Sequence, residues 1–263
     1  LASASYGGPL REALQQRVAL RLAAELGADR SFAAQVDCMV LLFRAQPALG
    51  EGCVWYRAHG RVGELSESFR RALSLSPGTE LVSDEASACC VQPAMPRRAP
   101  WHFVVASGAR ALLARLDASP TTLGQEWSWR TGVMGFSYHA VIAALTEAED
   151  EARGLAVVSP AHLRSAELWW GRKWVRLGGR RWLRPCLCAC PEVIDPRTWA
   201  WFQQPKVLVP GVARELLAVY DRDGRLAPLV AVHGAACEAA SGALLCALLE
   251  SSVLRWCWRA RHE

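Results

Sequence analysis

Proline and glycine interrupt one stretch of the chain, residues 76–100, and this stretch limits the fold to two separate parts. It contains Pro77, Gly78, Pro93, Pro96 and Pro100. Proline fixes φ and removes a backbone donor, so prolines this close together interrupt helices and sheets alike. A chain of 263 residues is long enough for two domains. We therefore predict a connecting segment over residues 46–100, followed by a compact unit that begins at residue 101. Within this segment we predict a short strand at 53–58 and a helix at 65–75, and residues 76–100 are the linker itself.

The first 45 residues predict an α/β piece. Pro9 follows two glycines and suits the first turn of a helix over residues 9–16. Residues 18–26 predict a strand. The nearly continuous apolar run over residues 36–43 predicts a strand that is buried on both faces. These elements cannot close a core of their own, so we expect them to be the last elements of a larger sheet.

Residues 101–263 predict a second unit of mixed α+β structure. A leucine-bearing helix follows Ser107, and a strand is expected at residues 206–209. The sequence Asp-Arg-Asp-Gly at 221–224 predicts a β-hairpin. An apolar stripe after Ser241 predicts a closing helix.

Two glycines bound a turn in this second unit, directly after a tryptophan-rich strand. Arg130 and Thr131 end the strand, and Gly132 and Gly135 follow. Glycine at such a turn permits a sharp backbone path and the close approach of a ligand. Arg130 and Thr131 are therefore candidates for contact with a phosphate or a guanine edge. The alternative is a solvated arginine that merely closes a strand.

The positive charge of the chain is almost entirely arginine. The net charge is +5 with a pI near 8.8, and Lys173 and Lys206 are the only lysines. This mild basic excess is compatible with nucleic acid, and arginine suits bidentate contacts with phosphates and bases. A genome rich in G and C, whose codons favour arginine over lysine, is the alternative cause.

The densest basic run lies between residues 172 and 184 and alternates with tryptophans. Its cations are Arg172, Lys173, Arg176, Arg180, Arg181 and Arg184. Trp170, Trp174 and Trp182 lie among them. Such cations neutralise phosphates, and aromatic rings stack on or wedge beside bases. The alternative is a solvated pair of strands with its tryptophans in the core.

Two features of the sequence indicate the cellular compartment: it has ten cysteines, and it lacks a long apolar run. The chain is long and has the composition of an ordinary core, so we expect reduced thiols in a cytoplasmic protein without a disulfide framework. Cys186, Cys188 and Cys190 alternate, which places three small groups on one face of an extended segment. We predict no metal site there, because paired zinc ligands are usually two to four residues apart. No uncharged apolar window reaches 18 residues, so we expect no contact with a membrane.

From residue 100 onward, a series of short motifs occurs in a recognisable order. They are Pro-Trp-His-Phe at 100–103, Thr-Leu-Gly at 122–124, the Gly-x-x-Gly turn at 132–135, Leu-Arg-Pro at 183–185, Pro-Lys-Val-Leu-Val at 205–209, and the leucine-rich segment at 243–252. This order resembles the TaqI-like target-recognition domain of adenine-N6 DNA methyltransferases from restriction–modification systems. In that pattern Lys206 begins a strand at a position that keeps a lysine, so Lys206 is a candidate phosphate contact or else a surface charge.

The N-terminal piece is similar to the end of the same family's catalytic domain. Tyr-Gly-Gly-Pro-Leu-Arg at 6–11 and Phe-Ala-Ala-Gln-Val-Asp-Cys at 32–38 carry this likeness. The resemblance implies that residues 1–45 complete a Rossmann-like methyltransferase sheet and that residues 101–263 form the target-recognition domain.

The resemblance implies an enzyme that methylates a flipped adenine from S-adenosylmethionine. The sequence has no Pro-Pro pair, so the family's Asn/Asp-Pro-Pro-aromatic motif is absent from these residues. We expect this motif and the cofactor site upstream of Leu1, and we assign no catalytic, cofactor-binding or metal-binding residue in this chain. We expect the isolated chain to bind duplex DNA weakly and in a salt-dependent way, without methylating it.

The sequence therefore predicts the DNA-recognition part of a site-specific adenine methyltransferase, in restriction–modification or phage defence. Its expected partners are duplex DNA and a fused or associated nuclease. The predicted DNA-binding residues are Arg130, Thr131, Arg172, Lys173, Arg176, Arg184 and Lys206. The alternative is a non-catalytic DNA-binding module or a degenerate remnant of such an enzyme. A third interpretation is an unrelated tryptophan-rich α+β protein that binds no DNA.

Overall fold

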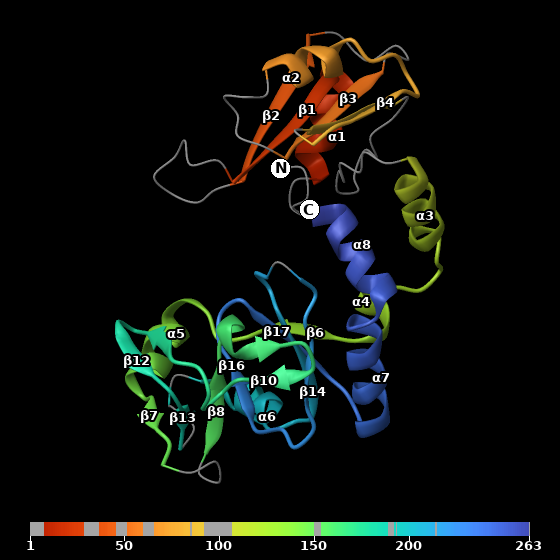
Figure 1. The fold of residues 1–263 in the computed structure, drawn as a ribbon. Helices are drawn as coiled ribbons and strands as arrows, with labels where there is room; N and C mark the ends of the chain where they lie inside the picture. The colour runs from red at the N-terminus through yellow and green to blue at the C-terminus, as the bar shows by residue number, and fades with distance from the viewer. Residues whose placement is uncertain are drawn as a thin grey trace. The chain divides into compact units, whose positions relative to one another are not determined.

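A computed structural model gives the architecture of the chain (Figure 1). It describes residues 8–28, 37–45, 52–59, 66–84, 86–91, 107–149, 154–188, 192, 194–213 and 215–262. The chain divides into two compact units. Unit 1 runs to Ala118 and includes Ala260–Glu263, and unit 2 covers Ser119–Arg259. The structure combines helices with mixed and antiparallel sheets, so the fold class is α+β.

Unit 1 is built on one five-stranded sheet in the order β2-β1-β3-β5-β4. Its elements are α1 (Gly8–Arg17), β1 (Ala19–Ala28), β2 (Asp37–Arg44), β3 (Cys53–Ala58), α2 (Ser66–Leu73), β4 (Glu80–Val82), β5 (Ala86–Val91) and α3 (Ser107–Asp117). Strands β1 and β3 are parallel, and the other neighbouring pairs are antiparallel. The helix and strand predicted at residues 9–16 and 18–26 are confirmed as α1 and β1.

Small and aromatic side chains fill the core between α2 and the sheet of unit 1. Tyr56 on β3 is buried and packs edge-on against Phe69 of α2, with ring centroids 5.2 Å apart. The Tyr56 hydroxyl also makes a 3.0 Å hydrogen bond with Ser68 Oγ. Ala72 on the same helix packs against Ala86 and other small residues of β5. The small side chains of β5 thus let α2 approach the sheet closely.

The prediction that residues 36–43 are buried on both faces is wrong for the part that the structure describes. Strand β2 lies at the edge of the sheet and pairs with β1. Met39, Val40 and Leu42 are 39%, 46% and 53% exposed. An apolar run cannot distinguish a central strand from an edge strand, because neighbouring strands and covering helices decide burial.

The strand predicted at 53–58 and the helix predicted at 65–75 are confirmed as β3 and α2. The linker predicted at 76–100 is wrong for its described part, because β4 and β5 belong to the sheet of unit 1. Ala86, Ala88 and Cys89 show no strong periodicity yet are fully buried in β5. The boundary between the units also lies later than residue 101. Helix α3 belongs to unit 1, where Arg110 bonds to Glu80 at 3.1 Å and to Cys89 Sγ at 3.0 Å.

Unit 2 contains many short strands. Up to residue 164 its elements are α4 (Leu123–Glu126), β6 (Trp129–Thr131), α5 (Gly135–Ala143), β7 (Thr146–Glu147), β8 (Leu155–Val158), the 3-10 helix η3 (Pro160–His162) and β9 (Leu163–Arg164). Next come β10 (Glu167–Leu168), β11 (Val175–Leu177), β12 (Arg180–Trp182), β13 (Pro185–Leu187), α6 (Pro196–Phe202) and β14 (Lys206–Pro210). The last elements are β15 (Val219–Asp221), β16 (Leu226–Pro228), β17 (Val232–Ala236), α7 (Ala239–Leu249) and α8 (Ser252–His262).

Two four-stranded sheets organise unit 2. One is antiparallel in the order β15-β14-β17-β6, and the other is mixed in the order β16-β8-β13-β7. Leu245 and Leu249 of α7 pack on Val207 and Ala235 of the first sheet. The strand predicted at 206–209 and the helix predicted after Ser241 are thus confirmed as β14 and α7. The helix begins slightly earlier, at Ala239, and ends at Leu249, so the stripe predicted to continue through Val253 and Trp256 is divided between α7 and α8.

The hairpin predicted at residues 221–224 is wrong. Strand β15 pairs with β14, whereas β16 pairs with β8 in the other sheet. The Asp221 carboxylate accepts hydrogen bonds from the backbone N–H groups of Arg225 and Leu226, at 2.9 and 3.0 Å. Gly224 takes a φ of 62° and lies close to the Gln203 carbonyl. The sequence correctly indicates a turn, but this turn passes the chain from one sheet to the other.

Within the described ranges, no single helix is long and apolar enough to cross a membrane. The bent pair Ala239–Leu249 and Ser252–Arg261 passes that test by length and composition only.

Candidate nucleic-acid interface

The hairpin β11–β12 exists because Gly178 and Gly179 close it. Their φ values are 56° and 80°, and two successive positive φ angles are typical of the two-residue hairpin turn that matches strand twist. The strands pair Val175 with Trp182 and Arg176 with Arg181. Since side chains alternate between the faces of a strand, the hairpin has one apolar face and one arginine-bearing face.

The apolar face anchors the hairpin to the core of unit 2. Val175, Leu177 and Trp182 are buried in one cluster with Val141 and Leu145. The indole N–H of Trp182 donates to the Leu177 carbonyl at 3.2 Å. The packing of these three side chains therefore fixes the hairpin backbone, including the backbone of the arginines on the other face.

The other face presents two arginines directly opposite each other. We call Trp174, Arg176 and Arg181 the arginine face. Arg176 and Arg181 are exposed, and the guanidinium of Arg181 lies 5.3 Å from the centroid of the Trp174 ring. Trp174 is itself 53% exposed. An exposed arginine face agrees both with the predicted DNA contact and with the alternative of a solvated strand pair, so it does not decide between them. Trp182 lies in the core, as that alternative expects, and Trp174 does not.

Like charges directly opposite on two strands destabilise a hairpin. In the part of the chain that the structure describes, no carboxylate forms an ion pair with Arg176, Arg180 or Arg181. An anion placed between Arg176 and Arg181 would remove this repulsion. The arginine face thus has the charge arrangement of an anion-binding surface.

The remaining cations of the run have different surroundings. Arg172 pairs with Glu167 on the surface, so its charge is partly neutralised. Lys173 lines a cavity of unit 2. Arg184 is half-buried and donates to the Glu149 carbonyl at 3.3 Å, while its own backbone N–H donates to Glu147 Oε1 at 2.6 Å. Arg184 therefore helps to fix the connection between β7 and β13. Its predicted contact with DNA stays a prediction.

Lys206 is buried, and the prediction that it contacts phosphate is wrong. Its side chain is 0% exposed, and its ammonium donates to Asp221 Oδ2 at 2.5 Å. It also donates to the carbonyls of Phe202 and Gln204, at 2.6 and 3.1 Å. Burial lowers the pKa of Lys206, and Asp221 opposes that shift. The buried ammonium is satisfied by these three acceptors, so Lys206 has a structural role in unit 2.

Arg130 and Thr131 lie at an edge of the antiparallel sheet, on β6, and not on the β11–β12 hairpin. Both are exposed, and the Arg130 guanidinium lies 5.3 Å from the centroid of the Trp201 ring. The Thr131 hydroxyl makes a 3.1 Å hydrogen bond with His233 Nδ1. Their predicted contact with DNA stays a prediction.

Gly132 is required by the protein's own backbone rather than by a ligand. A Cβ at this position would lie 2.3 Å from the Leu229 carbonyl oxygen and 2.4 Å from that of Pro228. The Gly132 N–H donates to the Val232 carbonyl at 2.9 Å. The space beside Gly132 is thus filled by the backbone that connects β16 to β17, and not by the ligand that the sequence suggests.

We expect Gly132→Ala to lower the free energy of unfolding by about 1–3 kcal/mol, because the methyl group forces backbone atoms apart. Chemical denaturation measures this effect. Gly124→Ala is the matched control, since Gly124 lies in α4 with open space around a Cβ. The control should be neutral or stabilising by up to about 1 kcal/mol. Equal destabilisation by both substitutions would contradict this packing argument.

The alternating cysteines form a small thiol cluster. Cys186 and Cys188 have sulfur atoms 3.9 Å apart, and both contact the Thr146 hydroxyl, at 3.2 and 3.3 Å. Burial raises the pKa of the Cys186 thiol. Cys190 lies outside the described residues. Among the residues that are described, no group of three or more metal-ligating side chains is found.

Comparison with known proteins identifies no relative from which a function could be inferred. No family model matches the sequence, and the search of curated proteins returned no match.

Proposed function

We propose that unit 2 binds duplex DNA through the arginine face of the β11–β12 hairpin. The observation that carries this proposal is the pair Arg176 and Arg181, directly opposite on a packed hairpin and without a carboxylate partner in the described part of the chain. A two-stranded ribbon fits the major groove of DNA. Arginine binds phosphate and guanine edges bidentately, and the exposed Trp174 ring supplies apolar contact beside them.

Arginines on a rigid hairpin are better suited to DNA than scattered surface cations are. The buried Val175, Leu177 and Trp182 fix the spacing of the two guanidinium groups before binding, so little ordering is required on association. Phosphates repeat along both strands of the duplex and can approach both arginines at once. Duplex DNA can therefore neutralise both arginines at once, whereas a ligand with a single carboxylate would neutralise only one of them.

We further propose that DNA binding serves a site-specific adenine-N6 methyltransferase, as the ordered motifs of the sequence imply. The support is the series itself, including the segments 183–187, 205–209 and 243–252, which contribute to β13, β14 and α7. In this proposal residues 1–45, which contribute α1, β1 and β2, complete a Rossmann-like methyltransferase sheet. The S-adenosylmethionine site and a nuclease partner would lie outside these residues, and the role of this chain is to bind the DNA. Eight of the cysteines in the described ranges carry free thiols, in keeping with the proposed cytoplasmic location.

The double variant Arg176→Gln/Arg181→Gln tests the DNA-binding proposal. We expect the dissociation constant for a duplex oligonucleotide to rise about tenfold, because two phosphate contacts are lost. The slope of log K against log salt concentration should fall by about 2, or about 1 for each contact. Fluorescence anisotropy over a range of salt concentrations measures both quantities. The variant should fold at least as well as the wild type, since it removes a like-charge pair.

Arg197→Gln/Arg222→Gln is the matched control. Both residues are exposed and lie outside the hairpin, and the double substitution removes the same total charge. We expect less than a threefold change in DNA affinity. If the two double variants weaken binding equally, the effect is one of net charge, and the arginine face is not the interface. Tritium transfer from S-adenosylmethionine to DNA by the full-length protein would test the methyltransferase role separately.

A further inference from the structure

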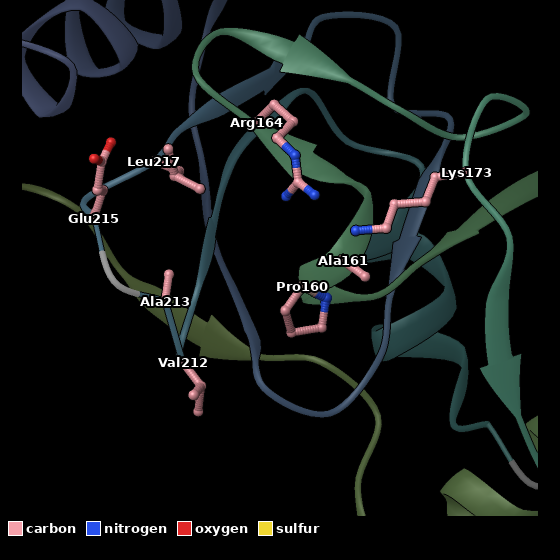
Figure 2. A pocket seen from close by; sticks show the side chains of 8 residues that line it. All are labelled: Pro160, Ala161, Arg164, Lys173, Val212, Ala213, Glu215 and Leu217. Carbon is pink, nitrogen blue, oxygen red and sulfur yellow. The ribbon is translucent and has the colours of Figure 1, made fainter. Parts of the chain in front are cut away.

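A cavity of about 450 Å³ opens on unit 2, and its lining includes none of the three residues of the arginine face (Figure 2). Its walls come from two regions of the sequence, residues 160–173 and residues 212–217. Pro160 and Ala161 belong to η3, Arg164 belongs to β9, and Lys173 lies between β10 and β11. The connection between β14 and β15 supplies Val212, Ala213, Glu215 and Leu217. Cavities of this volume are typical of small-molecule sites.

Two cations point into this cavity. Figure 2 shows the guanidinium of Arg164 and the ammonium of Lys173 directed toward the same space. Arg164 is held from behind, since its Cζ lies 4.8 Å from the centroid of the Trp169 ring and its Nη1 donates to the Leu163 carbonyl at 2.9 Å. The Lys173 backbone is fixed by a 3.0 Å hydrogen bond to the Trp169 carbonyl. One tryptophan thus positions both cationic residues.

The described residues leave these two charges uncompensated. Neither Arg164 nor Lys173 forms an ion pair with a described carboxylate. Glu215 is the acidic residue of the lining, and it pairs with Arg259 at 3.2 Å. In Figure 2 the Glu215 carboxylate points away from the two cations.

The charges of Arg164 and Lys173 reach the protein interior. His162 lies between β8 and β9 and is fully buried. Burial lowers its pKa to about 4, and Lys173 and Arg164 act on this pKa in the same direction. The two cations therefore create a positive potential at this site, and nothing among the described lining residues cancels it.

We propose that this cavity binds a phosphate group, with Arg164 and Lys173 as its two cationic ligands. The anionic oxygens shared by phosphomonoesters and phosphodiesters match two cations, and the planar guanidinium and compact ammonium bind these oxygens in complementary ways. Pro160, Ala161, Val212 and Leu217 form an apolar wall beside the charges. The cavity is larger than a bare phosphate, so the phosphate belongs to an organic phosphoester. This inference rests on the cavity alone and does not depend on the arginine face.

Isothermal titration of the full chain with inorganic phosphate, at constant ionic strength, tests the site. We expect saturable binding that Lys173→Met weakens at least tenfold. Arg180→Met is the matched control, because Arg180 is exposed on the hairpin and the substitution removes the same charge, and it should leave the phosphate affinity within twofold of wild type. A second substitution, Arg164→Gln, should reproduce the loss. Phosphate binding that is absent, or that Lys173→Met leaves unchanged, would overturn the proposal.

Binding of a duplex oligonucleotide shows whether the site holds a DNA backbone phosphate or a free phosphoester. If the site holds a DNA backbone phosphate, Lys173→Met weakens duplex binding at least threefold and inorganic phosphate competes with the duplex beyond the effect of equal ionic strength. If the site holds a free phosphoester, the duplex and phosphate bind together and Lys173→Met leaves duplex binding unchanged. In both cases the phosphate titration must show the loss in Lys173→Met. A failure of the arginine-face variants would leave this titration unaffected.

Discussion

Replacing Lys206 with methionine should lower the free energy of unfolding by about 3–5 kcal/mol, because it leaves a buried carboxylate without its cation. Asp221 is 4% exposed at its side chain and accepts the Lys206 ammonium at 2.5 Å. Two carbonyls, those of Phe202 and Gln204, also lose their donor. Urea denaturation at pH 7 measures this loss, which is large against the stability of an ordinary domain.

Two further variants separate the ion pair from simple loss of packing. Lys206→Met/Asp221→Asn should recover a substantial part of the lost stability, since the remaining partner no longer carries a charge. The N–H groups of Arg225 and Leu226 reach different oxygens of Asp221, so the single amide oxygen of the new asparagine can accept only one of them, and the recovery is partial. Lys173→Met is the control for removing a lysine outside the core, and we expect a change within about 0.5 kcal/mol. If Lys206→Met is as mild as this control, Lys206 is not part of a buried pair.

Lys206 also shows what the sequence could not reveal. The apolar residues after it correctly predicted a strand, but a lysine at the start of a strand is usually exposed. Its burial depends on Asp221, which lies 15 residues away and is placed opposite by the pairing of β14 with β15. Pairing of this kind is decided by the tertiary structure, and single-sequence patterns do not encode it.

The same limit explains most differences in the fold. Local signals located α1, β1, β14 and α7, since helix starts and apolar periods are properties of neighbouring residues. The sequence did not predict which strands pair when those strands are far apart in the chain. The apolar run of β2 was assigned to the middle of a sheet, and the Asp-Gly turn after β15 was assigned to a hairpin. The strand β2 and the turn after β15 both exist. However, β2 has β1 as its only neighbour in the described sheet, and β16 pairs with β8 instead of β15.

The candidate site was predicted in part. The run at 172–184 was identified by charge, and the structure confirms that Arg176 is exposed. The sequence did not separate Arg184, which bonds to the protein, from Arg181, which lies on the exposed face. Arg164 was missed, because the segment at 212–217 that completes its cavity lies some 50 residues away and carries no motif.

Acid should destabilise unit 2 through His162, by up to about 3 kcal/mol between pH 6.5 and pH 4. The ring is fully buried, its Nδ1 accepts the Ser159 N–H at 3.2 Å, and its Nε2 has no hydrogen-bond partner in the described structure. A second proton would therefore cost the Ser159 hydrogen bond and place a charge near Arg164 and Lys173. The pKa of His162 is accordingly lowered from 6.5 to about 4.

The direction of the pH effect follows from these two pKa values. Between pH 6.5 and pH 4 the unfolded chain binds a proton at His162 and the folded chain does not, so stability falls by about 1.4 kcal/mol for each pH unit that is lost. Below pH 4 both states are protonated, and the contribution of His162 becomes constant. Other groups also titrate in this range, so the comparison must be made against a variant in which only this residue cannot titrate.

His162→Asn is that variant, because the asparagine side-chain oxygen can accept the Ser159 N–H in place of Nδ1 and binds no proton in this range. Urea denaturation of both proteins at pH 7, 5.5 and 4.5 gives the comparison. We expect the wild type to lose about 2–3 kcal/mol more than the variant over this interval. Parallel pH curves for the two proteins would show that His162 ionises in the folded state near its ordinary pKa. The ring would then have to reach solvent, and the positive potential attributed to Arg164 and Lys173 would have no effect at this position.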